Sequence, residues 1–437
     1  MKHTAIIQNL LVFLNHSPSA WQAVSLSCNH LVELGFEILS EKEKWAIQPG
    51  RGYIVTRNGS SLCAFITPKK IPRSMRLIGS HTDSPSLKLK PIPEIRKQGA
   101  LLLGVEVYGS PLLHSWLNRD LGIAGRVFIT DRNDVLHEHI VCLDQYPVII
   151  PQLAIHLDRE VNEKGLQLNK QEHLYALAAI DSSLENDSFL ETILREKIHF
   201  KNLVSHDLFL FPLENARLLG YDHSLIAGYR IDSLASIHAA IYALSQSLEP
   251  FDNELKMIIC WDHEEIGSHT YQGASSPFFN QIVERIVSSY EGTREDYFCL
   301  LNRSLCMSVD LAHAVHPNYP EKHDANHQPL LGQGIVLKHN AQQRYATSAY
   351  SSLPVHRISS QKKIPIQHFV SRNDIPCGTT IGPIQSTKTG IPTVDLGCAQ
   401  LSMHSCREII ACRDHVYLCD FLENFLQNDE LFSSSWN

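Results

Sequence analysis

The sequence contains no apolar run long enough to cross a membrane. A spanning helix needs about 20 mostly apolar residues, and the longest early apolar run, Leu10 to Leu14, is too short even for the core of a signal peptide. Positive charge is not in excess either. The formal net charge of -8 argues against nucleic acid or an anionic membrane as a partner. We therefore expect a cytoplasmic protein that binds neither membranes nor nucleic acid.

Paired cysteines are missing as well. The 11 cysteines are an odd number, and no two of them form a C-x-x-C pair. Scattered thiols in a long chain favour a reducing compartment over a disulfide framework. Internal repeats and low-complexity tracts are also absent. The 437 residues, 43% hydrophobic and 19% charged, therefore indicate a globular protein of two or three domains.

Histidine, in contrast, is abundant, with 24 residues, and it is the usual neutral ligand for transition metals. Apolar runs that predict strands alternate with helical periodicity over much of the chain, which indicates a mostly parallel α/β sheet. In such sheets ligands gather beyond the carboxyl ends of the strands. Six polar residues lie at or just after apparent strand ends: His81, Asp232, Glu264, Glu265, Asp310 and His404.

A middle segment has a different pattern. Short β-type runs separated by polar turns begin near Lys90, and they predict a β-rich insert. The runs are Leu101–Val107, Ile123–Ile129, Ile140–Leu143 and Tyr146–Ile150. We expect an α/β domain made of residues 1–90 and 229–437, interrupted by a β-rich domain of residues 91–228.

Glu264 and Glu265 stand in tandem after an apolar run, Leu255 to Cys260, that predicts a buried strand. Burying an ionised carboxylate is costly unless a cation or hydrogen bonds compensate it. A loop at the strand end allows both acids to face one cleft, where one can hold a metal while the other moves a proton. For a lone Glu-Glu pair, a solvated loop would be the simpler interpretation.

Two other acids also allow two interpretations each. Asp83 follows His81 by two residues, which suits a metal-binding imidazole oriented by a carboxylate but also an ordinary polar turn. Asp232 precedes a predicted helix, Leu234 to Leu244, so it is either the N-cap of that helix or a carboxylate shared by two cations. The other strand-end residues favour the metal-binding interpretation in both cases.

Taken together, five of the six strand-end residues suit two divalent cations. Each cation has one histidine, one terminal carboxylate and a share of a bridging aspartate. Mixed nitrogen and oxygen ligands fit zinc, cobalt or manganese better than calcium or magnesium. Two such cations about 3.5–4 Å apart can hold and activate one water. Glu264 is then left as the general base.

Four motifs give the chain a specific resemblance. They are S-H-T-D-S-P from Ser80, D-H-E-E-I-G-S from Asp262, A-H-A-V-H-P-N-Y from Ala312 and R-N-D-I-P-C-G-T-T-I-G-P from Arg372. With these motifs the chain resembles, nearly end to end, the M18 family of metallo-aminopeptidases, and its bacterial members most. The resemblance implies an α/β proteolytic domain interrupted by a β-rich dimerisation domain, with dimers that assemble into dodecamers.

The resemblance also implies residue roles. His81 and Asp310 hold one metal, Glu265 and His404 the other, and Asp232 bridges them. Asp83 supports the centre, and Glu264 is the catalytic base. The substrate-side residues are His156, His313, Lys338 and Tyr345. From its local sequence alone His156 is a surface-loop histidine, whereas the family pattern places it in a neighbouring subunit's active site.

Some positions depart from the family pattern. Ser233 replaces the usual asparagine, Ser110-Pro111 interrupts a glycine-rich stretch, and Phe211 to Glu214 alters a strand end; Cys398 and Ser402 are minor changes. No metal or catalytic position is lost. We expect an aminopeptidase with two zinc-type cations that prefers N-terminal Asp or Glu. The alternatives are an aliphatic aminopeptidase, a hydrolase of N-acyl amino acids and a non-catalytic assembly protein.

Overall fold

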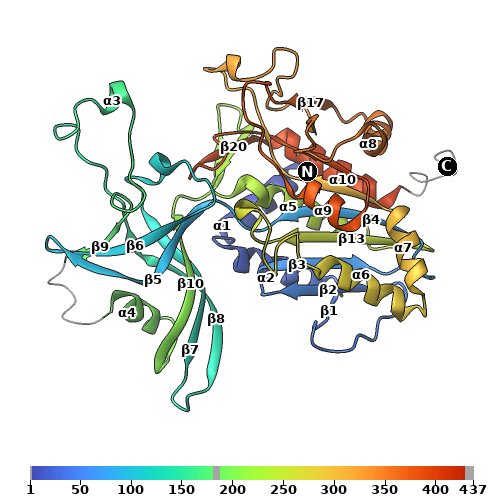
Figure 1. The fold of residues 1–437 in the computed structure, drawn as a ribbon, viewed down its shortest axis with the longest axis horizontal. Coiled ribbons are helices and arrows are strands. Elements are labelled where there is room, and N and C mark those ends of the chain that lie inside the picture. Colours follow the sequence, from blue (N-terminus) through green and yellow to red (C-terminus); the bar gives the residue numbers. More distant parts are fainter. Residues whose placement is uncertain (1, 181–187, 429–437) are drawn as a thin grey trace.

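The computed structural model describes residues 2–180 and 188–428. Its larger part is built on a nine-stranded sheet, and a β-rich part projects to one side (Figure 1). The strand order in the large sheet is β1-β2-β3-β13-β4-β14-β18-β16-β17. In chain order their bounds are β1 Glu37–Ile38, β2 Gly52–Arg57, β3 Ser61–Ile66, β4 Ser74–His81, β13 Glu254–Trp261, β14 Leu305–Val309, β16 Ile335–His339, β17 Ile366–Val370 and β18 Thr393–Gly397.

The centre of this sheet positions the functional residues. β4 lies between β13 and β14 and is parallel to both. All three strands are buried on both faces, apart from the first residue of β4, which is why they appear as nearly continuous apolar runs. The register places Trp261 opposite His81, so the loops after β4 and β13 leave the sheet at the same level.

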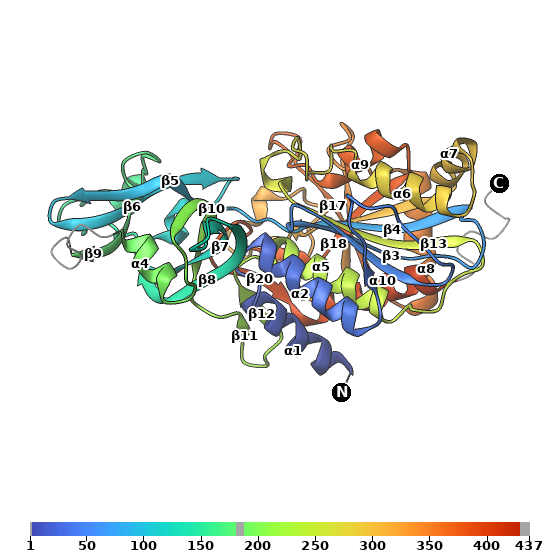
Figure 2. The ribbon, with the colours of Figure 1, turned by 90° about the horizontal axis from the view of Figure 1, so that it is seen from below.

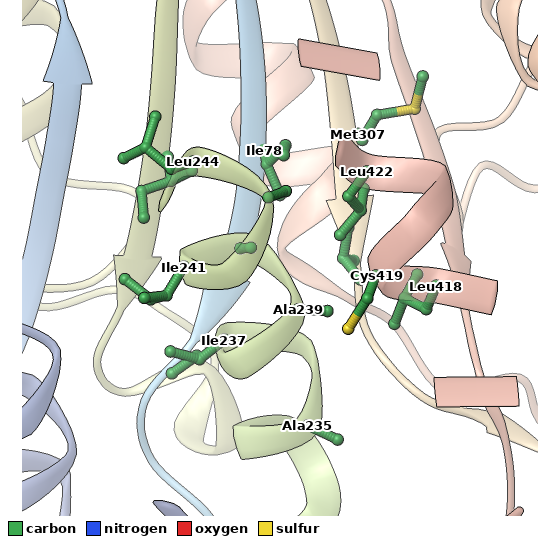
Figure 3. Close-up of a cluster of buried hydrophobic side chains, with 14 of the residues drawn as sticks. Ile78, Ala235, Ile237, Ala239, Ile241, Leu244, Met307, Leu418, Cys419 and Leu422 are labelled. Carbon is green, nitrogen blue, oxygen red and sulfur yellow. The ribbon is translucent and has the colours of Figure 1, made fainter. Parts of the chain in front are cut away.

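Helices cover both faces of the sheet (Figure 2). One apolar core joins a face to five helices: α1 Lys2–Asn15, α2 Ala20–Glu33, α5 Ile231–Ser245, α8 Ala349–Lys362 and α10 Cys412–Gln427. A second core joins the other face to three more: α6 Phe278–Ser289, α7 Arg294–Asn302 and α9 Ile381–Thr389. The small side chains of Ala235 and Ala239 on α5 face α10 (Figure 3), which allows the two helices to approach closely.

The β-rich part is an antiparallel sheet of six strands in the order β8-β7-β10-β5-β6-β9. Their bounds are β5 Ser86–Lys97, β6 Ala100–Tyr108, β7 Leu121–Thr130, β8 Leu136–Val148, β9 Ala176–Ile180 and β10 Asn202–Pro212. Its own apolar core includes Trp116 and the short helix α4 Phe189–Arg195. The short helix α3, Val161–Lys164, lies between β8 and β9.

Strand β8 replaces the two short strands expected at Ile140–Leu143 and Tyr146–Ile150. In its pairing with β7, Val148 lies opposite Leu121 and Leu143 lies opposite Ile123, so the register shifts between these two pairs. Four residues, 144–147, therefore bulge from one continuous strand. This bulge contains Pro147, and it interrupts the alternating pattern on which the expectation was based.

A third sheet is built from five short strands that all follow the six-stranded sheet in the chain. Its order is β11-β12-β20-β19-β15, with β11 Arg217–Leu219, β12 Leu225–Gly228, β15 Ala312–His313, β19 Ala399–Leu401 and β20 Glu408–Ala411. Residues 217–228, which the sequence-based boundary assigned to the insert, thus pair with a strand near the C-terminus. The six-stranded sheet itself extends from Ser86 to Pro212.

Two helices of the C-terminal half begin at well-defined points. Helix α8 begins at Ala349, where a capping box between Ser348 and Ser351 fixes its first turn. Helix α10 begins directly after β20, which separates it from the loop that follows Met403. In the part of the chain that the structure describes, no helix has both the length and the apolar character needed to span a membrane.

Candidate metal centre and active site

The six strand-end residues converge from five separate segments. His81 is the last residue of β4, Asp232 lies in the first turn of α5, and Asp310 directly follows β14. Glu264 and Glu265 form a single 3-10 turn, η3 Glu264–Ile266, just beyond β13. His404 lies in the loop between β19 and β20. Only the fold brings these segments together, at one end of the central strands.

Asp232 is at the middle of this cluster. Its Oδ1 lies 3.3 Å from Nε2 of His81, and its Oδ2 lies 3.6 Å from Nε2 of His404. Asp310 Oδ1 lies 3.5 Å from the same nitrogen of His81, and Glu265 Oε2 lies 3.5 Å from that of His404. Each histidine thus lies beside one acid of its own, Asp310 or Glu265, and both lie beside Asp232. This is the arrangement that a pair of cations with one bridging carboxylate requires.

The electrostatics of the cluster favour added positive charge. Burial, together with neighbouring acids, raises the pKa of Glu264 to about 8 and that of Glu265 well above its usual range. The pKa of Asp232 is raised for the same reasons. Burial alone would lower the pKa of His81, but hydrogen bonds to Asp232 and Asp310 raise it well above its usual value. Buried acids in this number need a cation to compensate them.

The donor set also fits a metal. Ligand atoms of His81, Asp232 and Glu265 all lie within 4.8 Å of one another. The buried Oδ1 of Asp232 accepts no hydrogen bond of good geometry from any described residue. Nδ1 of His81 lies 3.1 Å from the main-chain oxygen of Asp83, and this contact leaves Nε2 for a metal. The residues present therefore suit a pair of zinc-type cations.

Asp83 organises the turn that carries both glutamates. Its Oδ1 accepts the main-chain N–H of Glu264 at 3.1 Å, and its Oδ2 accepts that of Glu265 at 3.1 Å. The hydroxyl of Tyr108, from the β-rich part, donates to Oδ2 at 2.7 Å. The carboxylate of Asp83 lies 3.6 Å from Nδ1 of His81. Asp83 therefore fixes the main chain of both glutamates and also lies beside His81, the histidine that it was expected to support.

Glu408 is a residue of the centre that the sequence did not indicate. It is 2% exposed, and its two oxygens accept the main-chain N–H groups of Asp232 at 2.9 Å and His404 at 2.7 Å. It thereby joins the bridging acid to the last histidine. The only signal in the sequence was its place in the run Met403–Glu408, four residues after His404.

The unusual Ser110-Pro111 segment also contacts the centre. The main-chain oxygen of Ser110 lies 3.1 Å from Nδ1 of His404, and the N–H of Leu112 donates to the main-chain oxygen of His404 at 2.9 Å. A turn of the β-rich part thus orients a ligand of the α/β part. At the other departure, the hydroxyl of Ser233 lies 3.3 Å from that of Ser80.

Three of the four substrate-side residues lie near the centre. Nζ of Lys338 donates to Asp310 Oδ2 at 3.2 Å and to the main-chain oxygen of Leu311 at 2.8 Å, and it lies 5.2 Å from the ring centre of Tyr345. The Lys338 ammonium opposes the effect of burial and holds the pKa of Asp310 well below its usual range. His313 lines a cavity of about 350 Å³ together with Met403.

The fourth substrate-side residue, His156, is elsewhere. It is exposed in the loop after β8, in the β-rich part. Within a single chain, no contact among the described residues joins it to the metal cluster. Its expected role in a neighbouring subunit is not tested by one chain.

Comparison with known proteins agrees with this architecture. The family model described as aminopeptidase I zinc metalloprotease (M18) matches residues 13–426. A protein of Ectopseudomonas mendocina (strain ymp) named probable M18 family aminopeptidase 2 is 38% identical over 434 residues, covering 98% of this chain and 99% of that protein. A chain in the cryo-EM structure of the Ape4 and Nbr1 complex is 35% identical with a TM-score of 0.93, covering 98% of this chain and 86% of its own.

The S. cerevesiae mApe1 dodecamer is a third relative, 28% identical with a TM-score of 0.84 and a coverage of 97% of each chain. The expected fold class and enzyme class are thereby confirmed. The chain belongs to the M18 family of zinc metallo-aminopeptidases.

Proposed function

We propose that this metal-dependent aminopeptidase removes single N-terminal residues from peptides and prefers Asp and Glu. The observation that carries the proposal is the arrangement of five ligand side chains around Asp232, with Glu264 held beside them by Asp83. His81 and Asp310 would hold one cation and Glu265 and His404 the other, with Asp232 shared between them. When bound, two such cations supply Lewis acidity to the attacking water and to the developing oxyanion.

Glu264 is the base in this proposal. Its main chain is fixed through Asp83, and its side chain is the one acid of the cluster that is not assigned as a ligand. In this role the carboxylate accepts a proton from water and returns it to the leaving amine. Tyr345 and His313 lie on the substrate side, where they can contact the peptide.

The acidic preference depends on Lys338. An ammonium has three N–H donors, and the carboxylate of Asp310 and the carbonyl of Leu311 use two of them. The third donor suits a side-chain carboxylate of the substrate. The side chain of Lys338 is only 1% exposed, so water competes little for this donor. If Lys338 interacts only with Asp310 and not with the substrate, nothing in this proposal favours acidic residues, and substrates with aliphatic N-terminal residues should be cleaved faster.

The assembly is proposed on separate grounds. The β-rich part carries an exposed His156, distant in sequence from every metal-site residue, which suits a side chain that completes the site of a second copy. We propose a homodimer built through residues 91–228, and a dodecamer of such dimers like the S. cerevesiae relative. All 11 cysteines are free, which fits residence in a reducing cytoplasm.

A substrate panel tests the proposal. The purified enzyme is stripped with a chelator, reloaded separately with zinc, manganese or cobalt, and assayed on aminoacyl reporter substrates beside N-acyl amino acids. The proposal requires activity that chelation abolishes, that a metal restores, and that is highest for Asp or Glu. Faster cleavage of Leu substrates identifies an aliphatic aminopeptidase, and faster cleavage of N-acyl amino acids identifies an amidohydrolase.

A further inference from the structure

A second group of metal-ligating side chains lies between helices α5 and α10. His238 comes from α5, and His415 and Cys419 come from one face of α10, four residues apart. Their donor atoms all lie within 4.8 Å of one another. His415 and Cys419 are fully buried, and His238 is 8% exposed. None of the three belongs to the centre built around Asp232.

Hydrogen bonding does not account for this arrangement. Nε2 of His415 lies 2.9 Å from Nδ1 of His238 and 3.5 Å from Sγ of Cys419. A neutral imidazole nitrogen has either one proton or one lone pair, so it can satisfy only one of these neighbours. The other ring nitrogen of His415 is buried and has no hydrogen-bond partner among the described residues. Three atoms that could bind a metal therefore lie together, although only one hydrogen bond can form among them.

A tetrahedral cation would satisfy all three donors. Zinc binds nitrogen at about 2.0–2.1 Å and sulfur at about 2.3 Å, which places the ligand atoms roughly 3.3–3.6 Å apart. The nitrogen-to-sulfur distance of 3.5 Å already matches, and the two nitrogens at 2.9 Å need to separate only slightly. Figure 3 shows Cys419 on the side of α10 that faces Ala239 of α5.

The protonation states of the histidines also suit ligation. Burial lowers the pKa of His238 to about 3 and that of His415 well below its usual value, so both imidazoles are neutral at pH 7. Burial raises the pKa of Cys419 well above its usual value, so its thiol keeps its proton until a cation replaces it. On binding, the thiol proton is released to solvent and the thiolate of Cys419 binds the cation.

One of the three side chains borders a cavity. His238 lines a cavity of about 450 Å³ together with Phe13 of α1 and with His16 and His30 near the ends of α1 and α2. Both outer histidines are exposed. His415 and Cys419 do not line this cavity, so of the three side chains only His238 borders it.

We propose that His238, His415 and Cys419 bind one zinc-type, thiophilic cation at a third site, outside the dinuclear centre. The donor set of two imidazoles and one thiolate selects zinc over calcium, magnesium or manganese. A cation here links α5, which begins beside Asp232, to α10, which directly follows the strand that begins with Glu408. The third cation is therefore structural, because it joins two helices that lie next to Asp232 and Glu408 in the chain.

Cobalt provides a specific test because the dinuclear centre contains no sulfur ligand. The chelated full-length enzyme is titrated with Co²⁺ alone, and the thiolate-to-cobalt charge-transfer band is followed in the near ultraviolet. Wild type should develop the band, and once all sites are filled its amplitude should correspond to one thiolate-bound cobalt per chain. Cys419→Ala should lack the band, hold one cobalt fewer and keep its peptidase activity, which also shows that the variant is folded.

Cys63→Ala is the matched control, since Cys63 is equally buried in β3 and has no histidine contact among the described residues. It should keep the band. His238→Gln, which leaves the thiol in place, should weaken cobalt binding at this site at least tenfold, as loss of one of three ligands predicts. The proposal is wrong if active wild type loaded with excess Co²⁺ has no thiolate band, or if the band survives in Cys419→Ala.

Discussion

The two tandem glutamates differ through their surroundings rather than their chemistry. Both are fixed by the same acceptor, Asp83, yet only Glu265 has its carboxylate beside His404, at 3.5 Å. The 3-10 turn after β13 removes them from the strand, where they would point to opposite sides. This difference in surroundings is the basis for proposing Glu265 as a ligand and Glu264 as the base.

Glu264→Gln tests this division. The amide keeps the size of the side chain but cannot accept the proton, so turnover should fall by roughly 10²- to 10⁴-fold. Metal content, measured on the same protein by atomic emission, should stay near that of wild type. Glu265→Gln is the control and should lose metal as well as activity. Wild-type turnover in Glu264→Gln, or a loss of its metal, would contradict the assignment.

Lys338→Leu tests the acidic pocket. The change removes the charged donor and should lower kcat/KM for N-terminal Asp and Glu by roughly 10- to 100-fold, about 1.5–3 kcal/mol for a charged hydrogen bond. The kcat/KM for substrates with N-terminal Leu should fall much less.

The Leu substrate is also the internal control for that variant. Lys338 contacts Asp310, so damage to the metal centre would slow all substrates equally. If the ratio of the rates for Asp and Leu is unchanged while both fall, Lys338 supports only the metal ligand. Selection would then depend on another residue.

At the scale of elements, the sequence predicted the strands well and the connections less well. The strands that end at His81, near Glu264 and before Asp310 are continuous apolar runs, because parallel strands in a covered sheet are buried on both faces. β20 is only four residues long and follows a polar loop, so no periodicity marks it. The contribution of Glu408 could not be predicted, because one of its two partners, the N–H of Asp232, lies 176 residues away in the sequence.

Glu408→Gln tests how far β20 supports the centre. Glutamine has one carbonyl oxygen in place of two carboxylate oxygens, so it can accept from Asp232 or His404 but not equally from both. Metal affinity should fall about 10- to 100-fold, as is usual when a residue that orients ligands is changed. The measurement is competition with a chelator. Glu423→Gln, on the more exposed part of α10, should leave the affinity unchanged.

At the scale of the whole molecule, the β-rich insert and the α/β part share one site. Tyr108 donates to Asp83, and the turn at Ser110 orients His404, so the insert contacts both ends of the metal cluster. The contact between Ser110 and His404 was not predictable, because it joins segments 294 residues apart and involves a main-chain oxygen. The convergence of the strand-end ligands was predictable, since it follows from parallel topology.

The same reasoning gives a prediction for the assembly. His156 lies in an exposed loop of the insert, away from its own metal cluster, so its proposed role needs a second copy. His156→Ala should lower turnover without changing metal content. Its mixture with Glu264→Gln should regain activity, because a mixed dimer forms one site in which both residues are intact. Arg159, an exposed residue of the same loop, provides the control, and Arg159→Ala should be fully active alone. If the two inactive variants exchange subunits, as mass spectrometry of labelled chains can show, and yet no activity returns, the shared site is refuted, and His156 is a surface residue of the insert.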